Sequence, residues 1–324
     1  MVETIRKDVR MNTALLETVN RAKTLSIVGM CKNAGKTTVL NWLLRRSHGR
    51  VLGLTSIGRD GESVDVVTGT EKPGIFVPEG TLIATAKDML ALSDITQEIV
   101  YTTGIPTPLG EVVLVRARSA GSVQLAGPSI TSQLRTVSDL FFSLGAEQTI
   151  IDGALGRKSL GARTVAESVI LCTGASYDMR MEKVVRDTAN IFRVMNLKKA
   201  ATVPEPSDLP LADVLKETGE ALVPGALSDS AVLPLLKSGV LKNVRLVVKD
   251  PSKVLLSPDT LDKLAIRNVS LETVEAANVL CVTVNPVSAY GWKFDPDAFR
   301  RAVQAAVNVP VINVKEAQHD LDRL

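Results

Sequence analysis

Short apolar runs alternate with segments of helical periodicity along the first part of the chain. Apolar runs of strand length, each bounded by small or turn-forming residues, occupy residues 24–30, 51–58, 148–154 and 168–175. Apolar positions at the spacing of one helix face occur in residues 35–46 and 129–145. Buried apolar strands that alternate with helices predict an α/β fold, in which helices cover both faces of a mainly parallel sheet.

Three further segments extend this pattern. Residues 74–86 and 111–127 each contain two apolar runs around turn-forming residues, and we expect each of them to form a β-hairpin. Residues 4–20 approach helical periodicity. They predict a helix that lies against the first domain or against a partner.

A proline-rich stretch interrupts the alternation and indicates a domain boundary. The sequence ATVPEPSDLP, residues 201–210, places three prolines within ten residues, which disfavours regular helix and sheet. Beyond it the α/β alternation resumes and ends with a predicted strand in VPVINV, residues 309–314. We therefore predict a first domain over residues 1–200, which includes the N-terminal helix, a linker over 201–219 and a second, smaller α/β domain over 220–324.

Composition and charge narrow the classes of function. The 324 residues are 45% hydrophobic and 23% charged, as in folded globular proteins. A net charge of +3 and 3% aromatic residues argue against nucleic acid as the main partner. Neither a signal peptide nor 18 consecutive uncharged apolar residues occur, so we expect no contact with membranes and a cytoplasmic location. The cysteines have no metal-ligand spacing and are expected to be free thiols: Cys31, Cys172 and Cys281.

The stretch IVGMCKNAGKTT, residues 27–38, has the features of a phosphate-binding loop that is one residue longer than usual. The strict pattern would place its first glycine at Met30, whereas the nearest glycine is Gly29. A triphosphate needs close backbone approach, a lysine and a hydroxyl for the metal, which Gly35, Lys36 and Thr37 supply. The predicted nucleotide-binding residues are Gly29, Asn33, Ala34, Gly35, Lys36, Thr37 and Thr38.

The alternative interpretation of this stretch is an ordinary turn between a strand and a helix, with a surface lysine. We favour the phosphate loop because an apolar strand precedes it and a helix follows it, as the motif requires. The sequence does not identify the nucleobase of the predicted nucleotide. We prefer ATP to GTP because the sequence has no Asn-Lys-x-Asp type of guanine signature.

A magnesium-dependent phosphoryl site also needs carboxylates. Asp152 follows an apolar strand at the carboxyl edge of the predicted sheet, where ligands bind in open α/β sheets. Asp60 and Glu62 follow the second strand, although an Asp-Gly pair there is equally a turn signal. The predicted Mg²⁺ ligands are Thr37, Asp152, Asp60 and Glu62. The predicted catalytic residues are Lys36, Asp152, Asp60 and Lys32, of which Lys32 enters through the resemblance described next.

The longer loop spacing resembles that of dethiobiotin synthetase and its relatives, a class of dimer-forming P-loop proteins that also includes the MinD-type ATPases. In the MinD type an early loop lysine acts on the nucleotide of the neighbouring subunit. Lys32 is the matching candidate, although it lies one residue closer to Gly35 than that pattern requires. The alternative is a solvated surface lysine. The resemblance implies a homodimer as one arrangement open to this chain.

Several longer stretches resemble the KamB family of reactivating subunits that accompany lysine 5,6-aminomutase. They include VGMCKNAGKTTVLN, GLTSIGRDGE, IIDGALGRKS and, in the second domain, LVPGALSD and NPVSAYGWKFDP. The resemblance covers nearly the whole chain. It implies an accessory protein of bacterial lysine fermentation that, with a partner ATPase, helps to replace inactivated cobalamin in an adenosylcobalamin-dependent aminomutase.

Two classes of function stay open at this point. In the first, nucleotide binding switches the protein between two states that hold a client enzyme differently. In the second, the protein is a ligase or kinase like dethiobiotin synthetase, which transfers the γ-phosphate to a carboxylate or a hydroxyl. The second domain favours the switch, because a compact ligase does not need it and a client needs a surface to bind.

Overall fold

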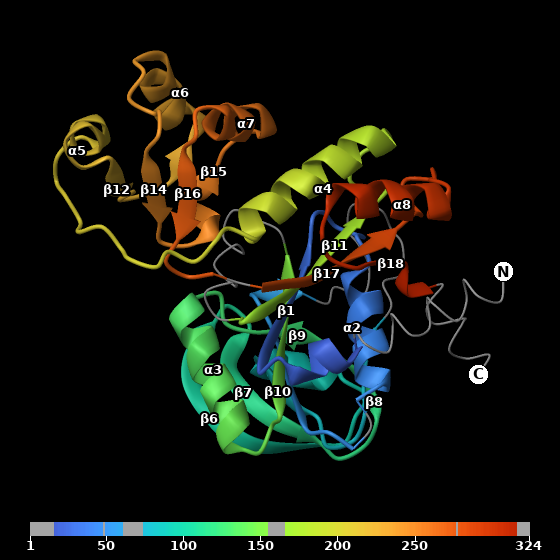
Figure 1. Ribbon diagram of the computed structural model, residues 1–324. Coiled ribbons are helices and arrows are strands. Elements are labelled where there is room, and N and C mark those ends of the chain that lie inside the picture. Colours follow the sequence, from blue (N-terminus) through green and yellow to red (C-terminus); the bar gives the residue numbers. More distant parts are fainter. Residues whose placement is uncertain (1–15, 48, 61–73, 155–165, 277, 316–324) are drawn as a thin grey trace. The chain divides into compact units, whose positions relative to one another are not determined.

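The computed structural model describes residues 16–47, 49–60, 74–154, 166–276 and 278–315 (Figure 1). The chain forms two compact units. The first consists of the described residues of Met1–Thr188 and Val279–Leu324, and the second is Ala189–Asn278. Within the described residues, no helix combines the length and the apolar character that crossing a membrane requires.

A nine-stranded sheet forms the centre of the first unit (Figure 1), in the order β18-β17-β11-β1-β10-β2-β5-β7-β6. Its strands are β1 (Thr24–Gly29), β2 (Leu52–Ser56), β5 (Leu82–Ala86), β6 (Gln97–Thr107), β7 (Gly110–Ala117), β10 (Gln148–Ala154), β11 (Ser168–Gly174), β17 (Asn278–Asn285) and β18 (Val311–Ile312). The pairs from β11 through β1, β10 and β2 to β5 are parallel, as is β17–β18, whereas β7 is antiparallel to β5 and β6. The predicted α/β class with a mainly parallel sheet is confirmed, and the sheet is mixed at its β6 edge.

Helices α2 (Lys36–Arg45) and α3 (Thr131–Ser143) cover opposite faces of this sheet (Figure 1). Neighbouring residues of a strand point to opposite faces. On β5, Ile83 joins the same hydrophobic cluster as Leu40 of α2, whereas Leu82 packs in the cluster of Phe141 on α3. At Gly53 of β2, a Cβ atom would lie 2.5 Å from the Phe141 ring, so the close approach of α3 requires glycine there. Helices η1 (Lys87–Leu92) and α8 (Pro296–Ala306) also belong to this unit, and α4 (Met181–Met195) begins in it.

The two predicted hairpins are wrong, although their strands exist. Strand β4 (Ile75–Val77) pairs with β8 (Gly121–Val123), and β5 pairs with β2 and β7. A further short pair joins β3 (Arg59–Asp60) to β9 (Leu125–Ala126). Each turn lies where the sequence indicates it, but the strands on either side of it find partners elsewhere in the unit.

The N-terminal helix is described only in part. Residues 16–21 are helical, and the side chains of Leu16 and Val19 pack against the core cluster that contains β1 and α2. The remainder of the predicted helix, residues 4–15, lies outside the described residues.

The second unit is a smaller α/β structure with a hydrophobic core of its own. Parallel strands β12 (Glu220–Leu222), β14 (Arg245–Val248) and β16 (Ser270–Thr273) form one sheet, and β13 (Leu227–Ser228) pairs in parallel with β15 (Val254–Leu255). The helical elements are α5 (Leu211–Thr218), α6 (Asp229–Lys237), η3 (Pro251–Lys253) and α7 (Pro258–Ile266). Fully buried Val232, Leu241 and Leu246 lie in its core.

The division of the chain differs from the boundaries predicted from the sequence. Strands β17 and β18 and helix α8, predicted in a second domain over 220–324, belong to the first unit, where β17 lies beside β11. The predicted linker over 201–219 contains α5. The second unit is thus an insertion in the chain of the first, which leaves it within α4 and returns to it at the start of β17. Hydrophobic periodicity shows that a strand exists but not which sheet it joins, so this insertion could not be read from the local pattern.

Candidate functional site

The predicted order of strand, loop and helix is confirmed for residues 24–45. The backbone N–H of Met30 donates a hydrogen bond of 2.9 Å to the carbonyl of Cys172, which extends the pairing of β1 with β11 by one residue. The loop then turns through two residues with positive φ, Asn33 at 61° and Gly35 at 95°, and α2 begins at Lys36. We call residues 30–35 the candidate loop.

Gly29 has a structural role that explains its position one residue earlier than the strict motif. A Cβ atom on Gly29 would lie 2.9 Å from Cγ and 3.0 Å from Cδ of Lys36. The stem of Lys36 therefore lies directly over Gly29, at the end of β1. The glycine makes room for the lysine, while Met30 continues the strand with a buried side chain.

The first turn of α2 provides backbone donors. The first helical hydrogen bond of this end runs from the Val39 N–H to the Gly35 carbonyl at 3.1 Å, and Gly35 provides no side-chain cap. The N–H groups of Lys36, Thr37 and Thr38 thus take no part in the hydrogen-bond ladder of the helix. Such a helix N-terminus, with a lysine beside it, suits an anion such as phosphate.

Asp152 lies next to the candidate loop on the neighbouring strand. In the parallel pairing of β1 with β10, Ile27 is opposite Asp152 and Gly29 is opposite Ala154. The Asp152 side chain is buried, with 2% of the residue exposed. The backbone carbonyl of Asp152 accepts a 3.0 Å hydrogen bond from the backbone N–H of Ile57, the residue that follows β2. The carboxyl edges of β1, β10 and β2 therefore meet at this point.

The charges of both Lys36 and Asp152 affect the pKa of the Cys172 thiol. Burial raises the pKa of Cys172 to about 12, Lys36 opposes this rise, and the Asp152 carboxylate adds to it. Burial also raises the pKa of Cys31 to about 11, again opposed by Lys36. Lys36 and Asp152 thus each lie within electrostatic range of the same buried thiol, in agreement with the Lys36 stem over Gly29 and with the pairing of β1 and β10. All three cysteines are free, as expected.

The other predicted site residues are placed less fully. Lys32 is exposed in the candidate loop, and Asp60 lies on β3, with only its backbone described. Glu62 lies outside the described residues. Among the residues that the structure describes, no group of three or more His, Cys, Asp or Glu could hold a metal ion.

The donor set at the candidate loop nevertheless fits magnesium. Mg²⁺ prefers oxygen ligands and is commonly held by one or two protein groups, with water and phosphate oxygens completing its shell. The Thr37 hydroxyl at the start of α2 and the Asp152 carboxylate on β10 are oxygen donors of this kind. A cluster of three acidic residues is therefore not required.

Two contacts of the candidate loop were not predicted from the sequence. The Asn285 side-chain amide at the end of β17 donates a 3.0 Å hydrogen bond to the carbonyl of Asn33. The Thr188 hydroxyl of α4, which donates to the Val184 carbonyl at 2.6 Å, lies in contact with the Met30 sulfur at 3.1 Å. Asn285 could have been found by the argument used for Asp152, because it is a polar residue at the end of an apolar strand. Thr188 gives no such signal.

A narrow cleft continues from the candidate loop toward β17 and β18. Its lining comes from the loop and the start of α2 on one side and from the ends of these two strands on the other. The lining residues are Ala34, Gly35, Thr38, Val39, Thr283, Val284, Asn285, Asn313, Val314 and Lys315.

The comparison with known protein families found no family that matches the chain, and the comparison with curated proteins found no significant match. The functional interpretation therefore depends on the geometry of the site and on the resemblance seen in the sequence.

Substituting Gly29 with alanine is expected to weaken binding of a nucleoside triphosphate by about tenfold. The new methyl group would displace the Lys36 stem, and a misplaced charge loses part of its interaction with phosphate. Titration calorimetry of both proteins measures the change. Gly153→Ala is the matched control, because the Cβ at this glycine at the end of β10 would meet atoms only at an ordinary 3.5 Å. Equal affinities for Gly29→Ala and Gly153→Ala would contradict the role given to Gly29.

Proposed function

We propose that this protein is a cytoplasmic, nucleotide-dependent accessory protein that reactivates an adenosylcobalamin-dependent aminomutase of lysine fermentation, together with a partner ATPase. ATP is the preferred nucleotide over GTP, with Mg²⁺ as its metal ion. One observation carries the nucleotide part. The Lys36 stem packs over Gly29 at the start of a helix whose first N–H groups lie outside its ladder, and Asp152 lies on the adjacent strand. The client is suggested by the sequence resemblance.

Residues in and beside the candidate loop have distinct tasks in this proposal. Asn33 and Gly35, with their positive φ angles, curve the backbone around the phosphates. Lys36 places a positive charge beside them, and Thr37 and Asp152 would hold the magnesium ion. The ion, when bound, would neutralise negative charge on the phosphate oxygens.

The connections to the second unit support a switch rather than a ligase. The chain passes between the units twice, within α4 and at the start of β17. Both segments contact the candidate loop inside the first unit, α4 through Thr188 and Met30, β17 through Asn285 and Asn33. A change of loop conformation on nucleotide binding therefore acts directly on both segments that lead to the second unit.

The second unit supplies the surface that a client needs in this proposal. Its separate hydrophobic core makes it a folded body of its own. A ligase or kinase that transfers phosphate to a small substrate does not need a second folded unit of this kind. A ligase or kinase that resembles dethiobiotin synthetase is the alternative.

Reactivation of an inactivated aminomutase is the expected result when this protein, its partner ATPase, ATP, Mg²⁺ and fresh adenosylcobalamin are added together. A switch can change the state of its client only as far as its affinity for the client differs between its nucleotide-bound and nucleotide-free states. The aminomutase should therefore bind this protein more tightly in one of these two states. Mutase activity is measured before and after addition, with Lys36→Ala as the control variant. Recovery that is as large with Lys36→Ala, or without nucleotide, would contradict the proposal. ATP turnover that depends on a small carboxylate or hydroxyl substrate would favour the ligase.

A further inference from the structure

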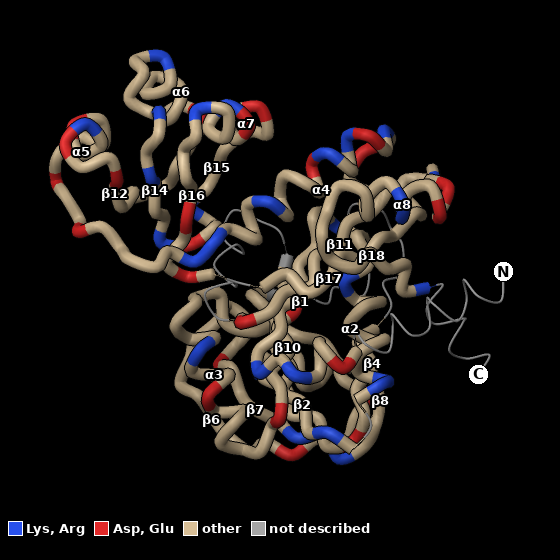
Figure 2. The backbone as a smooth tube through the Cα atoms, viewed as in Figure 1, with Lys and Arg blue, Asp and Glu red and all other residues tan. Residues whose placement is uncertain are grey.

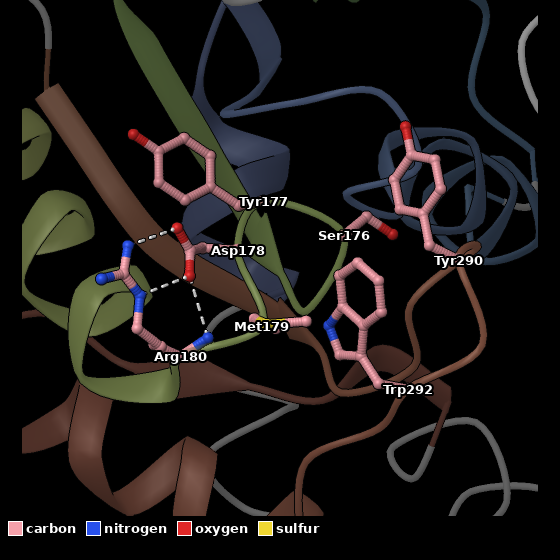
Figure 3. Close-up of a pocket in the computed structure, with 7 residues that line it drawn as sticks. All are labelled: Ser176, Tyr177, Asp178, Met179, Arg180, Tyr290 and Trp292. Carbon is pink, nitrogen blue, oxygen red and sulfur yellow. Dashed lines mark hydrogen bonds and ion pairs between the residues drawn. The ribbon is translucent and has the colours of Figure 1, made fainter.

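An open hollow of about 620 Å³ lies at the carboxyl edge of the sheet, apart from the narrow cleft (Figure 3). One side is the loop between β11 and α4, and the other is the loop between β17 and α8. The residues that line it are Ser176, Tyr177, Asp178, Met179, Arg180, Tyr290 and Trp292. Its volume falls in the usual range of small-molecule sites, about 300–1,000 Å³.

The hollow presents flat aromatic surfaces in a chain that is poor in them. Tyr290 and Trp292 stack with ring centroids 5.5 Å apart and an interplanar angle of 21°. Figure 3 shows Ser176 and Met179 beside the Trp292 ring. Met179 is 69% and Tyr290 is 49% exposed. With only 3% aromatic residues in the whole sequence, this gathering of rings stands out.

Hydrogen bonds hold the loop between β17 and α8, which carries Tyr290 and Trp292, in place before any ligand arrives. The indole N–H of Trp292 donates to the Ala175 carbonyl at 2.9 Å. The Ser288 N–H donates to the Trp292 carbonyl at 2.9 Å, and the Ala289 N–H donates to the Ser176 hydroxyl at 3.0 Å. The two loops are therefore tied together. Pre-ordered rings lose little conformational entropy when a ligand stacks on them.

The polar side chains of the hollow already have partners within the protein. Asp178 accepts from the Arg180 guanidinium, and the Tyr177 hydroxyl donates to Asp187, which also pairs with Lys183. Acidic and basic residues lie next to one another along α4 (Figure 2). Because these charges compensate each other, the free surface of the hollow consists mainly of ring faces and a thioether. Recognition by stacking is what such a surface offers.

We propose that this hollow binds a planar aromatic base of the nucleobase class, stacked on the ring pair of Tyr290 and Trp292. Two sources can supply such a base. It can belong to the nucleotide at the candidate loop. Asn285 precedes the β17–α8 loop that carries Tyr290 and Trp292, and its side chain donates a hydrogen bond to Asn33 of the candidate loop. The base can also belong to a separate nucleoside-like ligand. Only the first source rests on the proposed function.

Tryptophan fluorescence tests the proposal directly, because the chain has only two tryptophans, Trp42 and Trp292. Trp42→Phe leaves Trp292 as the single reporter. Adenosine, Mg²⁺ with ATP, and inorganic triphosphate are titrated in turn. We expect adenosine or ATP, but not inorganic triphosphate, to quench Trp292. Calorimetry with the unaltered chain provides the same affinities without a reporter.

Tyr290→Ala is expected to weaken binding of the quenching ligand about 5- to 100-fold, as loss of base stacking does. Tyr101→Ala is the matched control: Tyr101 is 46% exposed on β6, at the far edge of the sheet, and its loss should leave affinity unchanged. Adding Lys36→Ala separates the two sources. If quenching by ATP disappears and adenosine has no effect, the base is that of the nucleotide. If adenosine still quenches, the ligand is separate, even where ATP fails to bind and the proposed function falls.

The proposal is overturned if neither adenosine nor ATP quenches Trp292. It is equally overturned if Tyr290→Ala and Tyr101→Ala bind adenosine and ATP with the affinities of the parent protein.

Discussion

Replacing Lys36 with alanine is expected to weaken binding of Mg²⁺ and ATP about 100-fold or more while the fold stays intact. A lysine that meets phosphate makes charge-assisted hydrogen bonds, and losing about 3 kcal/mol corresponds to this factor. The fold should persist because Lys36 is only half-buried and its stem covers a glycine rather than core residues. Calorimetric titration measures affinity, and a thermal melt followed by circular dichroism measures stability.

Lys87→Ala is the matched control for this substitution. Lys87 is also the first residue of a helical element, η1, but it is exposed and follows β5, which is three strands away from β1 in the sheet. Its substitution should leave ATP affinity within about twofold of the parent, in the range of ordinary surface changes. ATP binding that is equally tight in Lys36→Ala and Lys87→Ala would show that the loop is not the binding site.

Asp152→Asn is expected to slow Mg²⁺-dependent hydrolysis about 100-fold and to weaken nucleotide binding much less. The amide keeps a side chain of the same shape but removes the negative charge that would face the metal ion, and metal-ion stabilisation of the transition state is worth several kcal/mol. Turnover of ATP and titration with a non-hydrolysable analogue measure the two quantities separately.

Asp250→Asn controls for the loss of a buried aspartate. Asp250 is 4% exposed in the second unit, where it accepts a hydrogen bond from the Ser252 N–H. This variant can lower thermal stability but should keep the hydrolysis rate of the parent. Equal losses of binding and hydrolysis in Asp152→Asn, or an equal loss of hydrolysis in Asp250→Asn, would count against a metal-binding role for Asp152.

Features that depend on neighbouring residues could be predicted from the sequence. Apolar runs at 24–30, 148–154 and 168–175 are strands β1, β10 and β11, and the helix after Gly35 begins at the expected lysine. The position of Asp152 at the same sheet edge as the candidate loop follows from one general rule, because the carboxyl ends of parallel strands meet at one edge.

Features that depend on distant partners could not be predicted in this way. The apolar pattern of β17 fits any buried strand, so its return to the large sheet beside β11 has no local signal. The same limit applies to β4 and β8, which pair with each other rather than with their chain neighbours. The reason for Gly29 appears only in three dimensions, where the Lys36 stem occupies the space of its missing side chain.

Hydrogen exchange with and without a non-hydrolysable ATP analogue and Mg²⁺ tests most directly whether the candidate loop holds the nucleotide. Backbone amides of residues 30–38 should exchange more slowly in the complex, because the proposal places phosphate against them. Strands β6 and β7, at the far edge of the sheet, provide the internal reference and should be unchanged. Tight binding of the analogue without slower exchange in residues 30–38, or no binding at all, would contradict the account.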